Sequence, residues 1–392
     1  MRPASVNRAK LAAALLICAC FGSIHAYGVL LIPVSAWLGI NRASASLGYS
    51  TAILALTAGV YVNGRVSGWL YPATRLMLSG LLSAGGLALA ALAGGWGGLI
   101  AGFGILYGLA NGVAYSVSLS LAAEALPGRA AKGIGLATAA YGLGAMLFGK
   151  LFAVLLFLGV GQLLLALAAL VLAACVLGAS IAGRPRQADA APVPVDAAVT
   201  QGRGGLLWII YVLGALAGLM VIAHAPAISL SYGAQTDEAS TASLFVAFGS
   251  VAGGYIGGVI VQALPNRVSL ALPLLTQAAA LCAILLAPGG SWVLAALAVT
   301  GLCYGILISA IPAVIQSLWG DKAFARVYGQ VFTAWGFAGL AGPLIAGYIY
   351  DASSHYGFAL GVAAALSLLA SGLSFGIGAS HPTTPPAYGA GM

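Results

Sequence analysis

The segment RPRQADAAPVPVDAAVTQGRGG, residues 184–205, decides how this chain is organised. It is polar and rich in proline and alanine, whereas the whole sequence is 61% hydrophobic and only 6% charged. Long apolar runs lie on both sides of it. A segment of this composition does not build a packed core, so we expect a flexible linker between two apolar halves.

Each half carries the same number of candidate membrane spans. A transmembrane helix needs about 20 mostly apolar residues, and six stretches on each side of the linker meet this requirement. The sequence therefore predicts an all-α membrane protein with one six-helix bundle over 1–183, a second over 206–380 and a disordered tail over 381–392. The twelve predicted transmembrane helices are 11–36, 47–66, 76–95, 97–123, 133–157, 160–182, 206–230, 241–263, 268–288, 291–317, 327–350 and 356–378.

The composition excludes several other classes of protein. Soluble domains carry about 25% charged residues, so this chain cannot cover a water-facing surface. The net charge of +8 does not indicate a nucleic-acid partner, because the basic residues lie in short loops between apolar runs. The five cysteines and four histidines show no metal-ligand spacing, and no histidine has a carboxylate partner within a span. We expect no enzyme activity, no metal and no cofactor.

The basic residues also predict the topology. Thirteen of the fifteen Lys and Arg residues fall on one side of the predicted membrane when the N-terminus is placed there. Because such residues accumulate in cytoplasmic loops, we expect both termini and the linker in the cytoplasm. The composition, rich in Ala, Gly and Leu, favours the inner (plasma) membrane of a bacterium, and we expect a monomer.

An internal repeat relates the two halves. Three segments of the first half align with the second at an offset of 193 or 194, and this near-constant offset predicts two pseudo-symmetric bundles. In such proteins the substrate site lies between the bundles near the middle of the membrane, and rocking exposes it to each side in turn. The aligned pairs are AGVYVNGRVSGWL (58–70) with AGGYIGGVIVQAL (252–264), GLANG (108–112) with GLCYG (301–305), and KGIGLATAAYG (132–142) with RVYGQVFTAWG (326–336).

These features resemble the major facilitator superfamily over essentially the whole chain. After the second span, that family carries a Gly-x-x-x-Asp-Arg-x-Gly motif. Gly64 is present here, but Gly68 stands where the family has the acid. The resemblance implies the major facilitator fold and secondary transport, and it implies that the usual latch between the halves lacks its acid.

A second resemblance concerns the substrate. LAAEALPGRAAKGIGLATAAYGLG, residues 121–144, is similar to the oxalate:formate antiporter and monocarboxylate transporter group. In the oxalate branch an arginine in the eighth span and a lysine in the eleventh bind carboxylate, and those positions are Gly254 and Trp335 here. A dicarboxylate such as oxalate is therefore not expected to bind in the same way.

Two histidines are the main candidates for contact with the substrate. His25 and His224 lie in the first span of each half, and an ionisable residue within a span is a functional candidate because its burial is costly. A neutral imidazole can donate to a substrate oxygen, and a protonated one can pair with a carboxylate and couple transport to protons. The alternative is structural, with each histidine bonded to a backbone carbonyl at a helix kink, which Pro226 favours for His224.

Six polar or aromatic residues are further candidates, with plain packing between helices as the alternative for each. One of them follows His25 by two residues and so faces about 200° away on a helix. Two others share a face of the fourth span, and the remaining three comprise one pair of repeat mates and the mate of one residue in the fourth span. The six are Tyr27, Asn111, Tyr115, Tyr141, Tyr304 and Trp335, where Tyr304 is the mate of Asn111 and Trp335 the mate of Tyr141.

The sequence favours a secondary transporter for a small organic anion, a monocarboxylate in the first instance, that is coupled to protons or exchanges anions. No Asp or Glu lies in the middle of a span, which disfavours a cationic substrate. The expected partners are the small-molecule substrate, protons and the lipid bilayer. The alternative is an exporter of neutral or amphipathic compounds on the same fold, which the aromatic and apolar composition also suits.

Overall fold

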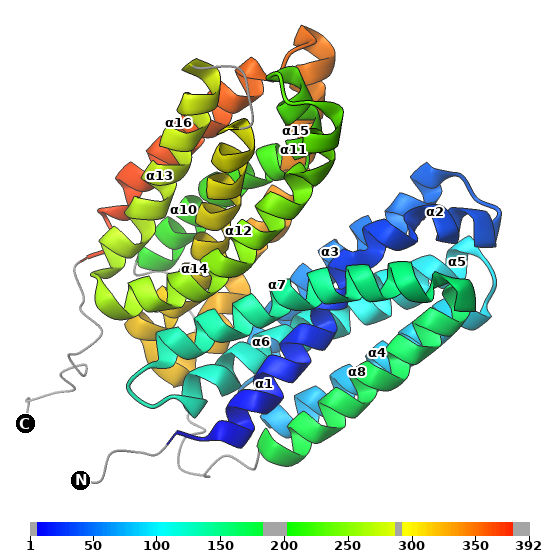
Figure 1. Cartoon of the computed structure of the whole chain (residues 1–392). Coiled ribbons are helices and arrows are strands. Elements are labelled where there is room, and N and C mark those ends of the chain that lie inside the picture. Colours follow the sequence, from blue (N-terminus) through cyan, green and yellow to red (C-terminus); the bar gives the residue numbers. More distant parts are fainter. Residues whose placement is uncertain (1–5, 183–201, 287–291, 379–392) are drawn as a thin grey trace, which may run out of the picture.

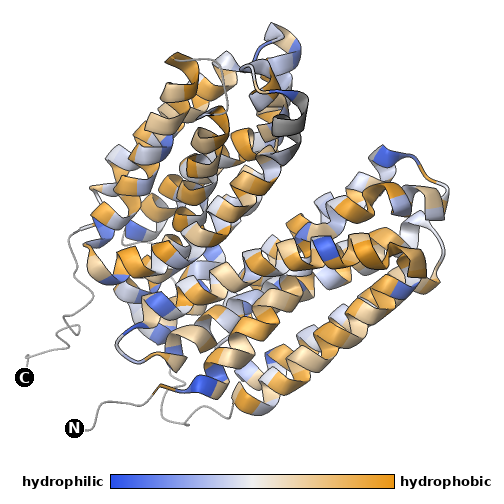
Figure 2. Cartoon of the chain, in the orientation of Figure 1, coloured by the Kyte–Doolittle hydropathy of each residue, from blue (hydrophilic) through white to orange (hydrophobic). Residues whose placement is uncertain are grey.

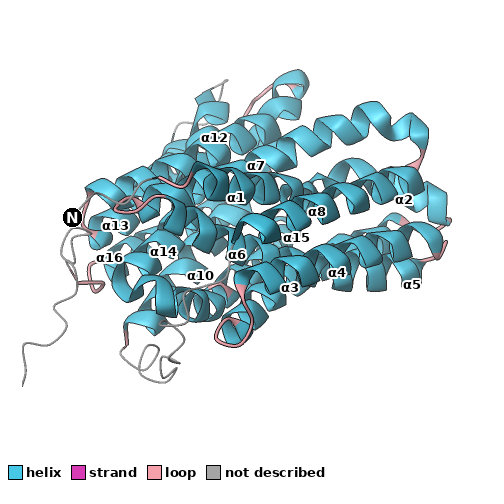
Figure 3. Ribbon diagram, turned by 90° about the horizontal axis from the view of Figure 1, so that it is seen from below, coloured by secondary structure: helices cyan, strands magenta, loops and turns pink. Residues whose placement is uncertain are grey.

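The computed structural model describes residues 6–182, 202–286 and 292–378, apart from the side chains of Ala43 and of residues 236–240. Most of the predicted linker and the predicted tail lie outside these ranges. The described chain is helical and contains no strand (Figure 3). Eleven helical stretches are long and apolar enough to span a membrane, and one of them, Trp292–Ser353, holds two spans. The predicted all-α architecture of twelve apolar helices is therefore confirmed.

The helices before the linker form one bundle (Figure 1). Most begin about one turn outside the predicted apolar run, and the first and fourth spans are each built from several helical pieces. In order they are α1 (Arg8–Phe21), the 3-10 segment η1 (Gly22–Ala26), α2 (Tyr27–Leu38), α3 (Arg42–Val66), α4 (Pro72–Leu92), α5 (Trp96–Gly98), the π-helical η2 (Leu99–Tyr107), α6 (Gly108–Ala125), α7 (Ala130–Leu155), the 3-10 segment η3 (Leu156–Leu158) and α8 (Val160–Ala182).

The helices after the linker form the second bundle (Figure 1). Its tenth and eleventh spans are joined at Gly320, whose φ of 67° is a left-handed value that glycine adopts without strain. The elements are α10 (Arg203–Ile222), α11 (Ala225–Ser231), α12 (Thr236–Ala263), α13 (Asn266–Leu286), α14 (Trp292–Val331), α15 (Thr333–Ser353) and α16 (Gly357–Ser374).

Local sequence signals set several helix ends. Asn41 caps α3, and its side chain accepts a hydrogen bond of 2.7 Å from the backbone nitrogen of Ser44. Pro72 occupies the first turn of α4, where its missing N–H costs nothing. Gly39 ends α2 with a left-handed φ of 62°. These signals place the short turns that bring consecutive helices back across the membrane.

The two bundles meet at one end and diverge toward the other (Figure 1). We call the end at which α1 begins and α16 ends the base, and the opposite end the top. Hydrophobic residues dominate the helices, and hydrophilic residues gather near the helix ends (Figure 2). Interbundle contacts at glycines all lie in the base half or the middle of their helices within the described chain.

Two repeat-related glycines make the closest of these contacts with backbone atoms. A methyl group added at Gly64 on α3 would lie 2.7 Å from the carbonyl oxygen of Ala325. At its repeat mate, Gly258 on α12, the methyl group would lie 2.4 Å from the carbonyl oxygen of Ala131. Ala131 and Ala325 are themselves 194 residues apart in the sequence. The repeat thus produces two equivalent seams, α3 against the α14–α15 junction and α12 against α7.

A buried arginine ties α4 to its neighbours near the base. Arg75 is 7% exposed, and its Nη1 donates to Oδ1 of Asn63 over 2.7 Å. Asn63 in turn donates through Nδ2 to Oγ of Ser116 over 2.9 Å. This chain of bonds satisfies polar groups of α3, α4 and α6 inside the bundle, where an unpaired polar group is costly.

Candidate functional site

Two hydrogen bonds, one in each bundle, join residues at equivalent positions of the repeat. In the first bundle the Tyr141 hydroxyl on α7 donates to Oδ1 of Asn111 on α6 over 3.0 Å. In the second bundle Nε1 of Trp335 on α15 donates to the hydroxyl oxygen of Tyr304 on α14 over 2.8 Å. The sequence pairs Asn111 with Tyr304 and Tyr141 with Trp335, so the same contact is built twice with different side chains. All four residues lie near the middle of their spans.

The two pairs differ in the hydrogen-bonding capacity that they leave unused. Asn111 also donates through Nδ2 to the carbonyl oxygen of Phe21 over 2.8 Å, so both ends of its amide are engaged. Tyr304 only accepts a bond from Trp335, because an indole N–H cannot accept. The hydroxyl hydrogen of Tyr304 has no partner among the described residues. The second bundle therefore offers a free donor at this depth.

An aromatic contact connects the two pairs across the bundle interface. The ring of Tyr115 lies 4.8 Å from that of Tyr141, and the ring of Phe332 lies 5.1 Å from that of Trp335. Tyr115 and Phe332 are 6.2 Å apart and come from opposite bundles. Each lies about one helical turn closer to the base than its bonded pair, which is about 5 Å along a helix. The contact forms a floor beneath the two pairs.

Two more tyrosines pack against Phe332 in this floor. Tyr328 lies 5.3 Å and Tyr211 lies 6.4 Å from Phe332, measured between ring centroids. Both are fully buried. Edge-to-face and offset contacts of this kind stabilise aromatic clusters beyond their area of burial. The base side of the candidate site is therefore closed by packed rings.

His25 lies next to the first pair, on the side toward the top. It belongs to η1, the 3-10 segment that interrupts the first span immediately after Phe21. Its Nδ1 lies 2.8 Å from the Tyr49 hydroxyl, and its ring meets that of Tyr141 edge-on at 5.5 Å. The ring is half-buried, and its Nε2 has no hydrogen-bond partner among the described residues. His25 therefore keeps one ring nitrogen for a ligand or water.

Tyr27 contacts Tyr49, as His25 does, but its hydroxyl bonds to a different group of α3. The Tyr27 hydroxyl donates to the carbonyl oxygen of Ala45 over 2.7 Å. Its ring lies 6.0 Å from that of Tyr49 and 4.8 Å from that of Phe103. Tyr27 thus ties α2 to α3 and supports Tyr49, the partner of His25.

His224 lies at the matching break in the first span of the second bundle, between α10 and α11. Its Nε2 lies 3.1 Å from the carbonyl oxygen of Pro343, so Nε2 must carry the hydrogen and donate. Its Nδ1 lies 3.2 Å from the Tyr356 hydroxyl, which donates to it when the imidazole is neutral. Both ring nitrogens of His224 are engaged within its own bundle.

Comparison with known proteins identifies the fold. The model of the Major Facilitator Superfamily matches residues 207–389. FucP, the fucose:proton symporter of E. coli, superposes in its outward conformation with a TM-score of 0.74 and 14% identity, covering 95% of this chain and 100% of FucP. The chain has the major facilitator fold. The proton:xylose symporter XylE gives a TM-score of 0.71 with 14% identity, covering 96% of this chain and 97% of XylE. No curated protein matches the sequence significantly.

Within this major facilitator fold the candidate site carries no formal charge. The described salt bridge joins Lys10 to Glu124 over 2.9 Å, near the base. The described residues contain no cluster of three His, Cys, Asp or Glu that could hold a metal ion. The structure brings together His25, Asn111, Tyr115 and Tyr141 in one bundle and Tyr304 and Trp335 in the other, while Tyr27 and His224 bond elsewhere.

Besides Tyr211 and Tyr328 of the floor, two residues of the site are not among the sequence candidates. Tyr49 lies on α3 and hydrogen-bonds to His25. Phe332 lies between the end of α14 and the start of α15. Phe332 falls inside the aligned segment 326–336, three residues before Trp335. That spacing places both on one helix face and was a usable signal. For Tyr49 no signal exists, because its role depends on how α3 packs against η1.

Proposed function

We propose that this protein is a secondary active transporter that moves a small organic anion, a monocarboxylate, through a site between its two bundles. The observation that carries the proposal is the pair of unused hydrogen-bonding groups, Nε2 of His25 on one bundle and the Tyr304 hydroxyl on the other. Nε2 of His25 donates when Nδ1 accepts from Tyr49 or when the ring is protonated. Donors on both sides suit a solute rich in acceptor oxygens, and the sequence places no acidic side chain in the middle of a span to repel its charge.

The residues around these donors have defined parts in the proposal. Tyr141 with Asn111 and Trp335 with Tyr304 form the two side walls. Tyr115 with Phe332 forms the floor. His25 takes up and releases a proton, so that its protonated form pairs with the carboxylate and its neutral form releases it. Tyr27 and His224 hold the helix breaks in place.

The diverging arrangement fits one state of an alternating-access cycle. We place the base in the cytoplasm, because the basic residues of the chain concentrate there. The state described then faces the periplasm, with its cytoplasmic side closed by the floor. Rocking about the glycine contacts opens the base and closes the top, as in transporters built from repeated bundles.

Uptake into proteoliposomes tests the substrate class. We expect radiolabelled lactate, pyruvate or formate to accumulate in the proteoliposomes when the outside is made acidic. L-Fucose and D-xylose, the kind of solute that FucP and XylE carry, should not accumulate. His25→Ala abolishes proton-driven uptake, and Tyr304→Phe raises KM about tenfold because one hydrogen bond to a charged group is lost.

Tyr27→Phe is the matched control for Tyr304→Phe. It also removes a buried phenol hydroxyl, but that hydroxyl bonds to the Ala45 carbonyl rather than to a ligand. Equal KM values for Tyr304→Phe and the parent protein would exclude the donor assigned to Tyr304. Uptake of sugars without uptake of carboxylates would exclude the anion.

A second candidate function is the export of a neutral or amphipathic compound. A cavity of about 440 Å³ between α3 and α15 favours it, because its lining is mostly apolar. Thermal stabilisation by lipophilic compounds, with none by carboxylates, would support this candidate.

A further inference from the structure

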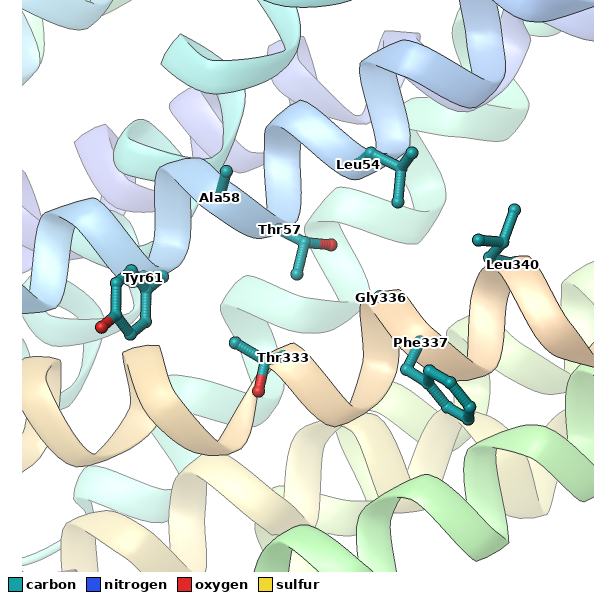
Figure 4. A pocket seen from close by; sticks show the side chains of 8 residues that line it. All are labelled: Leu54, Thr57, Ala58, Tyr61, Thr333, Gly336, Phe337 and Leu340. Carbon is teal, nitrogen blue, oxygen red and sulfur yellow. The ribbon is translucent and has the colours of Figure 1, made fainter.

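The cavity between α3 and α15 lies at one of the two seams between the bundles (Figure 4). Each helix presents one face to it, at positions i, i+3, i+4 and i+7. The lining residues of the two helices lie on either side of a gap that widens from Tyr61 and Thr333 toward Leu54 and Leu340 (Figure 4). The lining residues are Leu54, Thr57, Ala58 and Tyr61 of α3 and Thr333, Gly336, Phe337 and Leu340 of α15.

The hydroxyl groups of the two threonines in the lining are already bonded. The Thr57 hydroxyl donates to the carbonyl oxygen of Ile53 over 3.0 Å. The Thr333 hydroxyl donates to the carbonyl oxygen of Gln330 over 2.6 Å and accepts from Nε1 of Trp208 over 2.8 Å. The cavity therefore presents methyl, methylene and ring carbon atoms, and its contents are expected to be apolar.

The two seams differ at repeat-related positions. At the α7–α12 seam a methyl group added at Gly254 would lie 3.1 Å from the backbone nitrogen of Ala139, so the two backbones approach closely. At the α3–α15 seam the same positions are Val60 and Thr333, 194 residues away in each case. Both positions therefore carry larger side chains than their mates at the α7–α12 seam.

A cation stands at the base end of this cavity. Arg65 lies one turn from Tyr61 on the same face of α3, and its Nη2 donates to the Tyr61 hydroxyl over 2.6 Å. Its guanidinium carbon lies 5.2 Å above the Tyr61 ring, so the aromatic ring also attracts its charge. Arg65 is exposed and has no acidic partner among the described residues. Its repeat mate at the other seam is Val259, which carries no charge.

We propose that this seam binds an anionic phospholipid from the leaflet at the base, with its phosphate on Arg65 and one acyl chain in the α3–α15 cavity. The arrangement matches the order of groups in such a lipid: a positive charge at the membrane surface, an amphipathic tyrosine beneath it and an apolar cavity deeper in the bilayer. A volume of about 440 Å³ lies within the range of ligand sites.

The bound chain has a mechanical consequence for the seam. An acyl chain between α3 and α15 occupies the space that these helices must close when the bundles approach at the top. The lipid therefore stabilises the top-open state. This effect is independent of the identity of the transported solute.

Native mass spectrometry of the purified full-length protein tests the proposal. The protein is exchanged into mixed micelles with equal amounts of phosphatidylglycerol and phosphatidylcholine of the same acyl chains. We expect selective retention of phosphatidylglycerol, and Arg65→Gln lowers this retention about tenfold because one charge-assisted contact is lost. Arg267→Gln, which removes another exposed arginine near the base, leaves retention unchanged.

A variant that fills the cavity distinguishes the contribution of the acyl chain to lipid binding from that of the headgroup. Ala58→Phe places a ring in the cavity and leaves Arg65 intact, so we expect it to abolish retention of both lipids without lowering Tm. Equal retention of the two lipids by the parent protein, or unchanged retention in Arg65→Gln, overturns the proposal. A rise in Tm with inorganic phosphate that equals the rise with the lipid also overturns the proposal, because the acyl chain then contributes nothing.

Discussion

Gly64 and Gly258, 194 residues apart, each lie against a backbone carbonyl of the opposite bundle. The carbonyls belong to Ala325 and Ala131, which are repeat mates as well. One interbundle contact is thus built twice from the two copies of the repeat. Because neither glycine has a side chain, the bundles can roll on these contacts without any change of rotamer.

Gly258→Ala tests the importance of this close approach. The added methyl group would lie 2.4 Å from the Ala131 carbonyl oxygen, so the base contact must separate. We expect a cost of about 1–3 kcal/mol to the top-open state. Spin labels on Leu147→Cys and Leu244→Cys, near the tops of α7 and α12, should then report a shorter distance.

Gly149→Ala is the control for this substitution. It adds the same methyl group to α7, where the nearest atom, Cγ2 of Val29, is 3.9 Å away. The label distance should match that of the parent protein. A top-open population that is unchanged in Gly258→Ala would show that the seam has room to relax.

Phe332→Ala tests the aromatic floor. The substitution removes the ring that meets Tyr115 across the interface and leaves a gap beneath the candidate site. We expect faster proton leak through empty proteoliposomes, measured with a pH-sensitive dye inside the vesicles. Phe148→Ala, which removes an aromatic contact within α7, should leave the leak at the parent rate. Equal leak in both variants would place the seal elsewhere.

The bonds of His224 predict a structural part for this residue. Tyr356→Phe removes the hydroxyl that donates to Nδ1, and His224→Ala also leaves the Pro343 carbonyl without its donor. We expect losses of about 1 kcal/mol and about 1–3 kcal/mol in the free energy of unfolding, respectively. Substrate KM should stay unchanged in both variants. A raised KM in His224→Ala at normal stability would instead place this histidine in contact with the substrate.

Asn63→Ala tests the network around the buried arginine. It removes the acceptor for Arg75, which is 7% exposed and cannot reach water without rearrangement. Loss of a hydrogen bond to a charged group costs about 1.5–3 kcal/mol. Ser116→Ala removes only the neutral bond to Asn63 and should cost about 1 kcal/mol. Thermal unfolding in one detergent compares the two, and equal losses would show that Arg75 finds another partner.

The sequence was sufficient to predict the helices and to show which positions of the two halves are equivalent. Hydropathy locates the spans because a membrane helix must be apolar along its whole length. The repeat offset pairs Asn111 with Tyr304 and Tyr141 with Trp335, and the structure joins a member of one pair to a member of the other in each bundle. Equivalent backbone positions are inherited from the repeat, even where the side chains differ.

The parts that the sequence did not predict depend on rotation and packing. Tyr49 reaches His25 only because α3 turns that face toward η1, and hydropathy does not report such a rotation. The two histidines look equivalent in the sequence, yet only His25 keeps a free ring nitrogen. The cavity beside Thr333 arises from the crossing of two helices that are distant in the chain.

The hydrogen bond between Tyr141 and Asn111 lies within one bundle, and that between Trp335 and Tyr304 lies within the other. This arrangement determines how a solute can bring the two bundles together. Because each hydrogen-bonded pair lies inside one bundle, we expect its internal geometry to stay the same in every state of the proposed cycle. The distance between the two pairs is then the dimension that changes. A solute that is too short to contact both pairs can bind to one of them, but it cannot draw the bundles together.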